Sequence, residues 1–349
     1  MSSRGLPEIP HPIAYYRGPA GEIVCAGSAV EAARSPGSDA VPPRTVVSVG
    51  NFDGVHLGHA AILTRLQEMA ARLSAASVAF TFDPHPATLV RPGNAPAPLT
   101  TAPRRAELLL HLGIDRVVVQ PLVPALVQLS ATAFFDQVLQ QRLGAVGLVE
   151  GTDFRFGKGR EGDVAALTSL CECHGLAFDV VQAVHAGDGV VSSSRVRNLI
   201  ATGDVAAAAA ILTAPYRLTG QVVQGAQRGR TLGFPTANLA NINTLLPAPG
   251  VYAAIATIPP NATARPTTSR YPAAVHIGAN VSFGETAVSV EAHLMGYQGD
   301  LYHQPLHVDF LQRLRETLRF DSRHALVSQL KADVQQAGNV ASSWLGAGS

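Results

Sequence analysis

Lysine is almost absent from this sequence of 349 residues, which contains only Lys158 and Lys331. Neither residue ends a glycine-rich GxxxxGK[ST] run, so a Walker-type phosphate loop is excluded. A nucleotide site in this chain must therefore hold phosphate groups by other means.

An excess of charge and a long apolar run are also missing. The chain has 26 basic and 25 acidic residues, a net charge of +1, which argues against a nucleic-acid partner. The longest apolar run, residues 205–212, is far shorter than the roughly 20 residues of a bilayer span, so we expect no membrane partner. The first residues lack the apolar region of a secretory signal, so the cytoplasm is the expected location.

Three cysteines are too few for a disulfide scaffold in a chain of this length. The segment Cys171-Glu172-Cys173-His174 suggests a zinc site, but no second pair of ligands with knuckle spacing follows it. We therefore favour ordinary thiols at these positions.

The length predicts two domains, and the pattern changes near residue 213. Residues 1–44 are rich in Pro, Gly, Ser and Ala and are expected to form a leader that wraps or frays. In residues 45–213, β-rich runs alternate with helical patterns, which predicts an α/β domain with a doubly wound parallel sheet. The expected strands are 45–49, 77–82, 116–120, 146–150 and 178–184, and the expected helices are 56–74, 131–143, 164–175 and 194–212.

Residues 214–349 show short strand-like runs separated by Gly/Pro turns. This pattern predicts a small antiparallel β-barrel, followed by a helix from about residue 323 to 337. The expected strands are 217–224, 250–257, 271–278, 288–295 and 305–311.

The strand 45–49 runs directly into the segment GNFDGVHLGH, residues 50–59, and then into a helix. Glycines permit a tight turn, and the free N–H groups of a helix start bind anions. His56 and His59, three residues apart, are expected to project to one side and donate hydrogen bonds to phosphate, and Gly58 between them lacks a side chain that would block the phosphates. Two such histidines are usually structural when taken alone, but their place at the carboxyl end of a parallel strand favours nucleotidyl transfer.

Other loops are expected at the same edge of the sheet. Asp83-Pro84-His85 follows the second strand, Asp153 follows the fourth, and Ser192-Ser193-Ser194 begins a helix that carries Arg197 in its first turn. The serines are equally consistent with a simple helix cap and with a site for the β- and γ-phosphates of ATP.

The C-terminal half carries a second candidate site. Gly225 and a Gly/Arg segment lead to Leu232-Gly233-Phe234-Pro235-Thr236-Ala237-Asn238, which is either a flap over a phosphate or an ordinary loop, and spacing alone favours the loop. Thr236 and Asn238 offer hard oxygen ligands to Mg²⁺. Glu291 and His293 share one face of a strand, either as a solvent-facing polar stripe or, with Glu291 inside the barrel, as a base for an alcohol.

Taken together, the motifs GNFDGVHLGH, TFDPHP, GTDFRFG and SSSRVR resemble the nucleotidyltransferase module of the prokaryotic bifunctional riboflavin kinase/FAD synthetase family. Departures from the family pattern are Ser194 for Thr, Asp83 for Glu, and Val190 at a position that is often basic. The resemblance implies ATP and phosphate binding by Gly50, Asn51, Phe52, Asp53, Gly54, His56, Gly58, His59, Asp153, Ser193, Ser194 and Arg197, and a flavin-side loop at Asp83, Pro84 and His85.

The motifs LGFPTAN, LPAPGVYAA, VHIGANVSFGE, VEAHLMGYQGDLY and VDFLQRLR resemble the riboflavin kinase module of the same family. The resemblance implies that Glu291 is the base and that Thr236 and Asn238 hold Mg²⁺ and ATP. Departures are Val281, Ser282 and His303, the last at a position where Gly is frequent. The remaining implied ATP contacts are Gly225, Arg230, Gly233 and Pro235.

The expected function is phosphorylation of riboflavin to FMN by the C-terminal domain and adenylyl transfer from ATP to FMN by the N-terminal domain. The substrates are then riboflavin, FMN and ATP, with Mg²⁺ as the metal. Two other hypotheses remain at this point: an adenylyltransferase for another small phosphorylated substrate, and a flavin-binding or regulatory protein with decayed sites.

Overall fold

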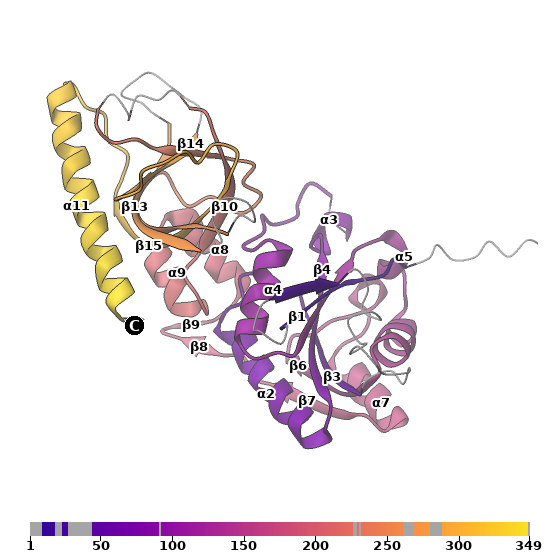
Figure 1. The fold of residues 1–349 in the computed structure, drawn as a ribbon. Coiled ribbons are helices and arrows are strands. Elements are labelled where there is room, and N and C mark those ends of the chain that lie inside the picture. Colours follow the sequence, from indigo (N-terminus) through magenta and orange to yellow (C-terminus); the bar gives the residue numbers. More distant parts are fainter. Residues whose placement is uncertain are drawn as a thin grey trace, which may run out of the picture. The chain divides into compact units, whose positions relative to one another are not determined.

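A computed structural model describes residues 9–17, 23–26, 44–90, 92–225, 229, 232–260, 268–279 and 288–347. The chain divides into two compact units, residues 1–192 and 193–349, each with its own sheet (Figure 1). Within the described part of the chain, no helix has the length and apolar character needed to cross a membrane.

The first unit is built on a seven-stranded sheet with the order β2-β1-β5-β4-β3-β6-β7. The five strands β3 to β7 run parallel to one another, so the prediction of a doubly wound parallel sheet is confirmed. β3 lies between β4 and β6, and the strand order therefore reverses at β3, where ligands bind in such sheets. The parallel strands are β3 (Thr45–Val49), β4 (Ala76–Asp83), β5 (Arg116–Pro121), β6 (Ala145–Gly151) and β7 (Ala177–Val181).

Part of the expected leader belongs to this sheet. β1 (Ile13–Arg17) pairs antiparallel with β5, and β2 (Ile23–Ala26) pairs antiparallel with β1. The side chain of Gln120 donates to the carbonyl oxygen of Pro10 at 3.0 Å. The expectation of a leader that only wraps or frays is therefore wrong for these residues, because strand β1 covers the otherwise open edge of β5.

Helices cover the sheet of the first unit. α2 (Leu57–Leu73) buries Leu63, Leu66 and Met69 and contacts β3 and β6. The predicted helix 131–143 consists of one α-helical turn followed by a π-helix. The remaining elements are α3 (Ala87–Val90), α4 (Ala102–His111), α5 (Pro124–Val127), α6 (Ala131–Phe134), η1 (Phe135–Arg142), η2 (Lys158–Arg160), α7 (Val164–His174), β8 (His185–Ala186) and β9 (Gly189–Val190).

The predicted helix 194–212 is two helices, α8 (Ser193–Thr202) and α9 (Val205–Ile211). Gly203 between them has a φ of +84°, and Asp204 caps α9 by accepting from the backbone N–H of Ala207. Both helices belong to the second unit, where the backbone N–H of Ala248 donates to the carbonyl oxygen of Ile200 at 3.2 Å. The compact units therefore divide before α8, earlier than the boundary near residue 213 that the sequence predicts.

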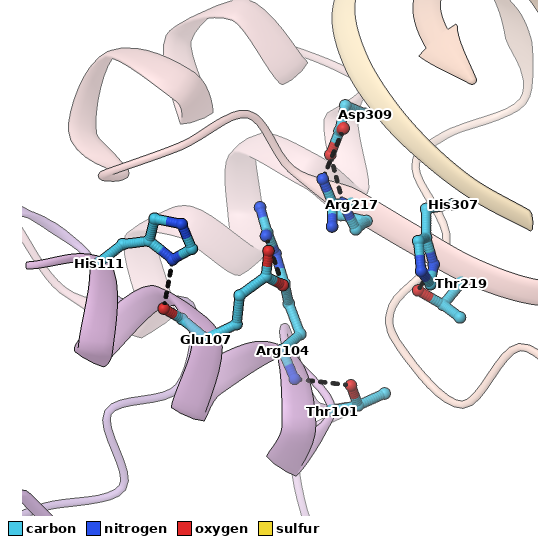
Figure 2. A network of polar contacts seen from close by, with 8 residues as sticks. All are labelled: Thr101, Arg104, Glu107, His111, Arg217, Thr219, His307 and Asp309. Atoms are coloured by element: carbon cyan, nitrogen blue, oxygen red, sulfur yellow. Dashed lines mark hydrogen bonds and ion pairs between the residues drawn. The ribbon is translucent and has the colours of Figure 1, made fainter. Parts of the chain in front are cut away.

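The predicted small antiparallel barrel is confirmed in the second unit as a closed barrel of six strands with the order β10-β11-β14-β13-β12-β15, in which β11 is not among the expected strands (Figure 1). α11 (Arg323–Ala347) runs further than predicted and contacts β12 and β13. A bidentate ion pair joins Arg217 to Asp309 between β10 and β15 (Figure 2). The barrel strands are β10 (Arg217–Val223), β11 (Ala237–Ala240), β12 (Gly250–Ile258), β13 (Ser269–Gly278), β14 (Ser289–Leu294) and β15 (Pro305–Arg315).

The attachment of α11 to the barrel depends on a buried ion pair. Arg315 of β15 donates from Nε to Asp333 Oδ1 at 2.9 Å and from Nη2 to Oδ2 at 2.6 Å, and Asp333 is only 3% exposed. We expect Asp333→Asn to lower the free energy of unfolding by about 3 kcal/mol, because it leaves a half-buried guanidinium without its counterion. The only tryptophan of the chain, Trp344, lies on α11, so its fluorescence during urea unfolding reports this transition.

Asp321→Asn is the matched control, since Asp321 is an exposed carboxylate just before the same helix. Its unfolding free energy should stay within about 0.5 kcal/mol of the wild type. Equal values for both variants would show that the Arg315–Asp333 pair does not stabilise this helix.

Candidate active sites

Two histidines form a reciprocal pair at the start of α2. His56 is the N-cap residue, and its Nδ1 accepts from the backbone N–H of His59, while Nδ1 of His59 accepts from the backbone N–H of His56, both at 3.3 Å. The rings stack with centroids 3.6 Å apart and an interplanar angle of 16°. Because both Nδ1 atoms accept hydrogen bonds, a neutral ring carries its proton on Nε2. The pair therefore presents two N–H donors on one side, as the sequence predicts.

Burial keeps both rings neutral. It lowers the pKa of His56 to about 4, although nearby Asp53 and Asp153 act in the opposite direction. Burial also lowers the pKa of His59 well below its ordinary value, and the neighbouring His56 and Arg105 lower it further. At neutral pH the pair offers hydrogen bonds to a phosphate but no positive charge.

The loop before α2 has a strained backbone that surrounds these rings. Phe52 and Val55 have φ angles of 46° and 45°, a conformation that costs a non-glycine residue about 1–3 kcal/mol. The buried Phe52 ring meets the His59 ring edge to face, with centroids 5.2 Å apart. A Cβ on Gly58 would lie 3.1 Å from the His56 ring, and one on Gly50 would lie 3.1 Å from the Phe52 ring. These glycines therefore make room for the rings, so the role of Gly58 differs from the expected one of leaving room for phosphate.

Asp53 holds this loop to a neighbouring segment. Its carboxylate is 2% exposed and accepts from the backbone N–H groups of Leu99 and Thr100 and from the Thr100 hydroxyl, each at 3.0 Å. Gly54, with a φ of 87°, donates its N–H to the same hydroxyl. The contacts of Asp53 and Gly54 therefore fix the shape of the loop.

The flavin-side loop is joined to the first loop by one hydrogen bond. The side chains of Asn51 and His85 meet at 3.0 Å, and Nδ1 of His85 accepts from the backbone N–H of Ala87 at 3.1 Å. Asp83 is the last residue of β4, and Pro84 lies between it and His85. The structure thus brings the expected residues of these two strand ends together.

Asp153 follows β6 and lies close enough to influence the charge of His56, so it also belongs to this edge. Ser193, Ser194 and Arg197 begin α8 in the second unit. Val190, the departure from the family pattern, lies on β9 and is exposed.

Two buried charged side chains of the first unit are missing from the sequence prediction. Glu150 of β6 is 3% exposed and accepts the backbone N–H of Val49 at 2.7 Å, and burial raises the pKa of its carboxyl group well above the usual range. Arg105 of α4 is 4% exposed. The position of Glu150 at the end of the apolar run 146–149 could have indicated that its carboxyl group is buried. Nothing in the sequence indicates that Arg105 is buried and that the adjacent Arg104 is not.

In the barrel, Glu291 is held by two hydroxyl groups. Thr236 Oγ1 donates to Glu291 Oε2 at 3.3 Å, and Ser289 Oγ donates to Glu291 Oε1 at 3.1 Å. Asn238 pairs with Glu291 in the register of β11 and β14. Val290, Ala292 and Leu294 of β14 are buried, and Glu291 lies on the opposite face of the strand, so of the two alternatives that the sequence leaves open the structure favours the polar stripe over a glutamate inside the barrel.

The neighbouring loop is shaped around Asn238. A Cβ on Gly225 would lie 2.3 Å from the Asn238 side chain, so only glycine fits there. His293 Nδ1 lies 2.8 Å from the carbonyl oxygen of Pro235 and therefore donates to it, and its ring meets that of Phe234 edge to face. Gly233 has a φ of 88°. The structure thus brings Gly225, Pro235, Thr236, Asn238 and Glu291 together as predicted.

Three residues named from the sequence, Arg230, Val281 and Ser282, lie outside the described residues. His303 has a φ of 64°, in the left-handed region that favours glycine. Its backbone N–H donates to the carbonyl oxygen of Val222 at 2.8 Å.

The fold and the sites define a class: a doubly wound nucleotide-binding unit with paired histidines at its switch point, joined to a β-barrel unit with a hydroxyl-bound glutamate. Comparison with protein families identifies the chain further. Residues 38–195 match the FAD synthetase family, and residues 212–341 match the riboflavin kinase family.

Curated relatives match both units together. The chain is 38% identical over 293 residues to the bifunctional riboflavin kinase/FMN adenylyltransferase of Pseudomonas fluorescens, covering 84% of this chain and 91% of that protein. It is 33% identical over 288 residues to the enzyme of the same name from Escherichia coli K12, covering 82% and 90%. The chain belongs to the bifunctional riboflavin kinase/FMN adenylyltransferase family, and its activities are phosphorylation of riboflavin and adenylyl transfer to FMN.

A solved structure is also similar over most of the chain. It is titled the crystal structure of a macrolide-efflux protein from Streptococcus pneumoniae, and it aligns with a TM-score of 0.74 and 29% identity, covering 86% of this chain and 95% of that chain. Its fold therefore extends over both units of this chain.

The histidine geometry makes a spectroscopic prediction. We expect the ring signal of His56 to titrate with a midpoint at about 4 and that of His59 well below the ordinary histidine value, and ¹⁵N shifts at pH 7 to report the Nε2–H form. Since both pKa values are lower in the folded state, the contribution of these rings to stability is complete above about pH 6.5 and declines as the pH falls toward 4. A midpoint near 6.5 for either ring would contradict the reciprocal pairing.

Proposed function

We propose that adenylyl transfer takes place at the histidine pair, with His56 and His59 each donating Nε2–H to phosphate oxygens of ATP. In this step an oxygen of the FMN phosphate attacks the α-phosphorus of ATP, the bond from that phosphorus to the bridging oxygen breaks, and pyrophosphate leaves. Donors fixed before the reaction stabilise the charge that develops on these oxygens. The reciprocal hydrogen bonding of the two histidines is the observation that supports this assignment.

Other residues that the family resemblance implies have supporting roles in the proposal. The loop of Gly50, Asn51, Phe52, Asp53 and Gly54 shapes the nucleotide site together with Gly58 and Asp153. The hydroxyl groups of Ser193 and Ser194 and the guanidinium of Arg197 bind the β- and γ-phosphates. The loop of Asp83, Pro84 and His85 borders the flavin.

In the barrel unit we propose that Glu291 accepts the proton of the riboflavin 5′-hydroxyl group as its oxygen attacks the γ-phosphorus of ATP. ADP is then the leaving group, and FMN is the product. Hydrogen bonds from Thr236 and Ser289 fix the orientation of the carboxylate. Gly225, Gly233, Pro235 and Arg230 belong to the segment that borders ATP in this proposal.

Magnesium fits the oxygen donors of the barrel site. The Thr236 hydroxyl group lies beside Glu291, and Asn238 faces the same carboxylate across the strand pair. Neutral oxygen ligands that leave positions for phosphate oxygens suit Mg²⁺, which is held mainly by its substrate in kinases. Thr236 and Asn238 would hold the ion, and the ion would neutralise charge on the phosphate groups of ATP.

The proposed partners are therefore riboflavin, FMN and ATP. The three cysteines, Cys25, Cys171 and Cys173, are free, which agrees with the reducing environment of the cytoplasm as the proposed compartment. In the described parts of the chain no group of three or more His, Cys, Asp or Glu residues has the geometry to hold a metal, so the segment 171–174 gains no support as a zinc site.

For the kinase, we expect Glu291→Gln to lower FMN formation from riboflavin by a factor of about 10² or more, because the amide cannot accept the proton. Conversion of added FMN to FAD by the same preparation should stay near the wild-type rate. The exposed Glu316→Gln is the matched control and should leave both rates unchanged. Full kinase activity in Glu291→Gln would remove Glu291 from its role as the base.

For the transferase, we expect His59→Ala to lower FAD formation from FMN by a factor of about 10² or more, since it removes one preorganised donor. FMN formation should be unaffected in this variant. His111→Ala, which replaces an exposed histidine of α4, provides the comparison. If His59→Ala retained the wild-type rate of FAD formation, the histidine would have a structural role only.

A further inference from the structure

Arg105 is the one arginine or lysine with a fully buried side chain in the described part of the chain. It lies on α4, is 4% exposed, and has no ion pair with any described residue. An isolated buried charge is costly, and buried guanidinium groups are normally paired with a carboxylate or a phosphate. Arg105 therefore requires an explanation.

The hydrogen bonds of Arg105 account for only part of its guanidinium group. Nη1 donates to Thr81 Oγ1 and to the carbonyl oxygen of Phe82, both at 2.9 Å, and these bonds attach α4 to the end of β4. Nε has no partner and is shut off from solvent, and no described residue bonds to Nη2. A purely structural role needs the two bonds of Nη1 and leaves the other donors unused.

The surroundings of Arg105 are those of the transferase site. Burial lowers the pKa of Arg105, whereas nearby Asp53 and Asp83 act in the opposite direction and favour its charged form, and Arg105 in turn lowers the pKa of His59. The Asp53 carboxylate already accepts hydrogen bonds from Leu99 and Thr100. Its hydrogen bonds hold the cation at the end of β4, the strand that leads into the flavin-side loop.

The reaction needs positive charge at this place. It brings the phosphate dianion of FMN against the polyanionic ATP, and the histidine pair is neutral, so it offers hydrogen bonds without charge. A fixed guanidinium group satisfies this need, because it remains protonated when buried and its Nη2 group still has N–H donors for a phosphate.

We propose that Arg105 is the residue that binds the phosphate group of FMN and positions it for attack on ATP. Its place beside Asp83, at the end of β4, favours the flavin phosphate over the phosphates of ATP. This inference rests on the proposed function of the His56 and His59 site. The bond changes are those of the adenylyl transfer given above, and Arg105 exchanges no proton in them.

Steady-state kinetics of Arg105→Met test the proposal by measuring KM separately for FMN and for ATP, the two substrates that could supply the bound phosphate group. We expect the KM for FMN to rise by about tenfold or more, because a charge-assisted contact to the phosphate is lost. The KM for ATP should stay within about twofold, and the riboflavin kinase rate of the same chain should be unchanged. A larger rise in the KM for ATP would overturn the proposal in favour of a nucleotide phosphate.

Arg104→Met is the matched control, because Arg104 is the neighbouring residue on α4 and forms an ion pair with Glu107 at 2.8 Å (Figure 2). It should leave both KM values unchanged. If Arg105→Met does not fold, Arg105→Lys replaces it in the test, because lysine keeps the charge but lacks the planar guanidinium group. We expect the KM for FMN to rise by about threefold or more in Arg105→Lys, with the KM for ATP unchanged.

An unchanged KM for FMN in the folded variants would overturn the role of Arg105 and leave the proposed transferase site standing. Absence of FAD formation by the wild-type chain, or full transferase activity in His59→Ala, would instead remove the proposed site, and the role of Arg105 with it. The two failures are therefore distinguishable.

Discussion

Two hydrogen bonds at the start of α2 fix the orientation of the His56 and His59 rings, which we propose as the hydrogen-bond donors to phosphate in the first unit. Because the Nδ1 atoms of His56 and His59 accept each other's backbone N–H groups, the rings are stacked and carry their protons on Nε2 when they are neutral. The stack requires Gly58, whose missing side chain makes room for the His56 ring, and it requires the strained turn that places Phe52 against His59. A neutral pair of donors also explains why this edge of the sheet needs a separate buried cation.

In the barrel unit, other side chains orient the proposed catalytic group. Glu291 lies on the outer face of β14, and its orientation comes from the hydroxyl groups of Thr236 and Ser289. Asn238 sits on the adjacent strand, with Gly225 leaving space for its amide. Since lysine is almost absent from the chain, both proposed sites use imidazole, hydroxyl, amide and guanidinium groups instead.

The motifs predict the chemistry of both sites, because His56, His59, Thr236, Asn238 and Glu291 each stand in a recognisable local pattern, and the roles of these residues stay predictions. The alternation of strands and helices likewise predicted the parallel sheet and the barrel. Features that depend on tertiary packing were not predictable: Arg104 and Arg105 are identical neighbours in sequence, yet one forms a partly exposed ion pair and the other is buried. The same applies to β1, a strand inside a Pro- and Gly-rich segment, and to α8 and α9, which pack with the barrel.

One chain is assigned two successive transfers from ATP at two separate sites: a phosphoryl group to riboflavin and then an adenylyl group to FMN. Incubation of the purified wild-type chain with riboflavin, ATP and Mg²⁺, followed over time by chromatography of the flavins and nucleotides, tests this assignment most directly. The account predicts that FMN appears first together with ADP, and that FAD follows with release of one pyrophosphate for each FAD formed. Accumulation of FMN without FAD, or failure to consume riboflavin, would contradict it.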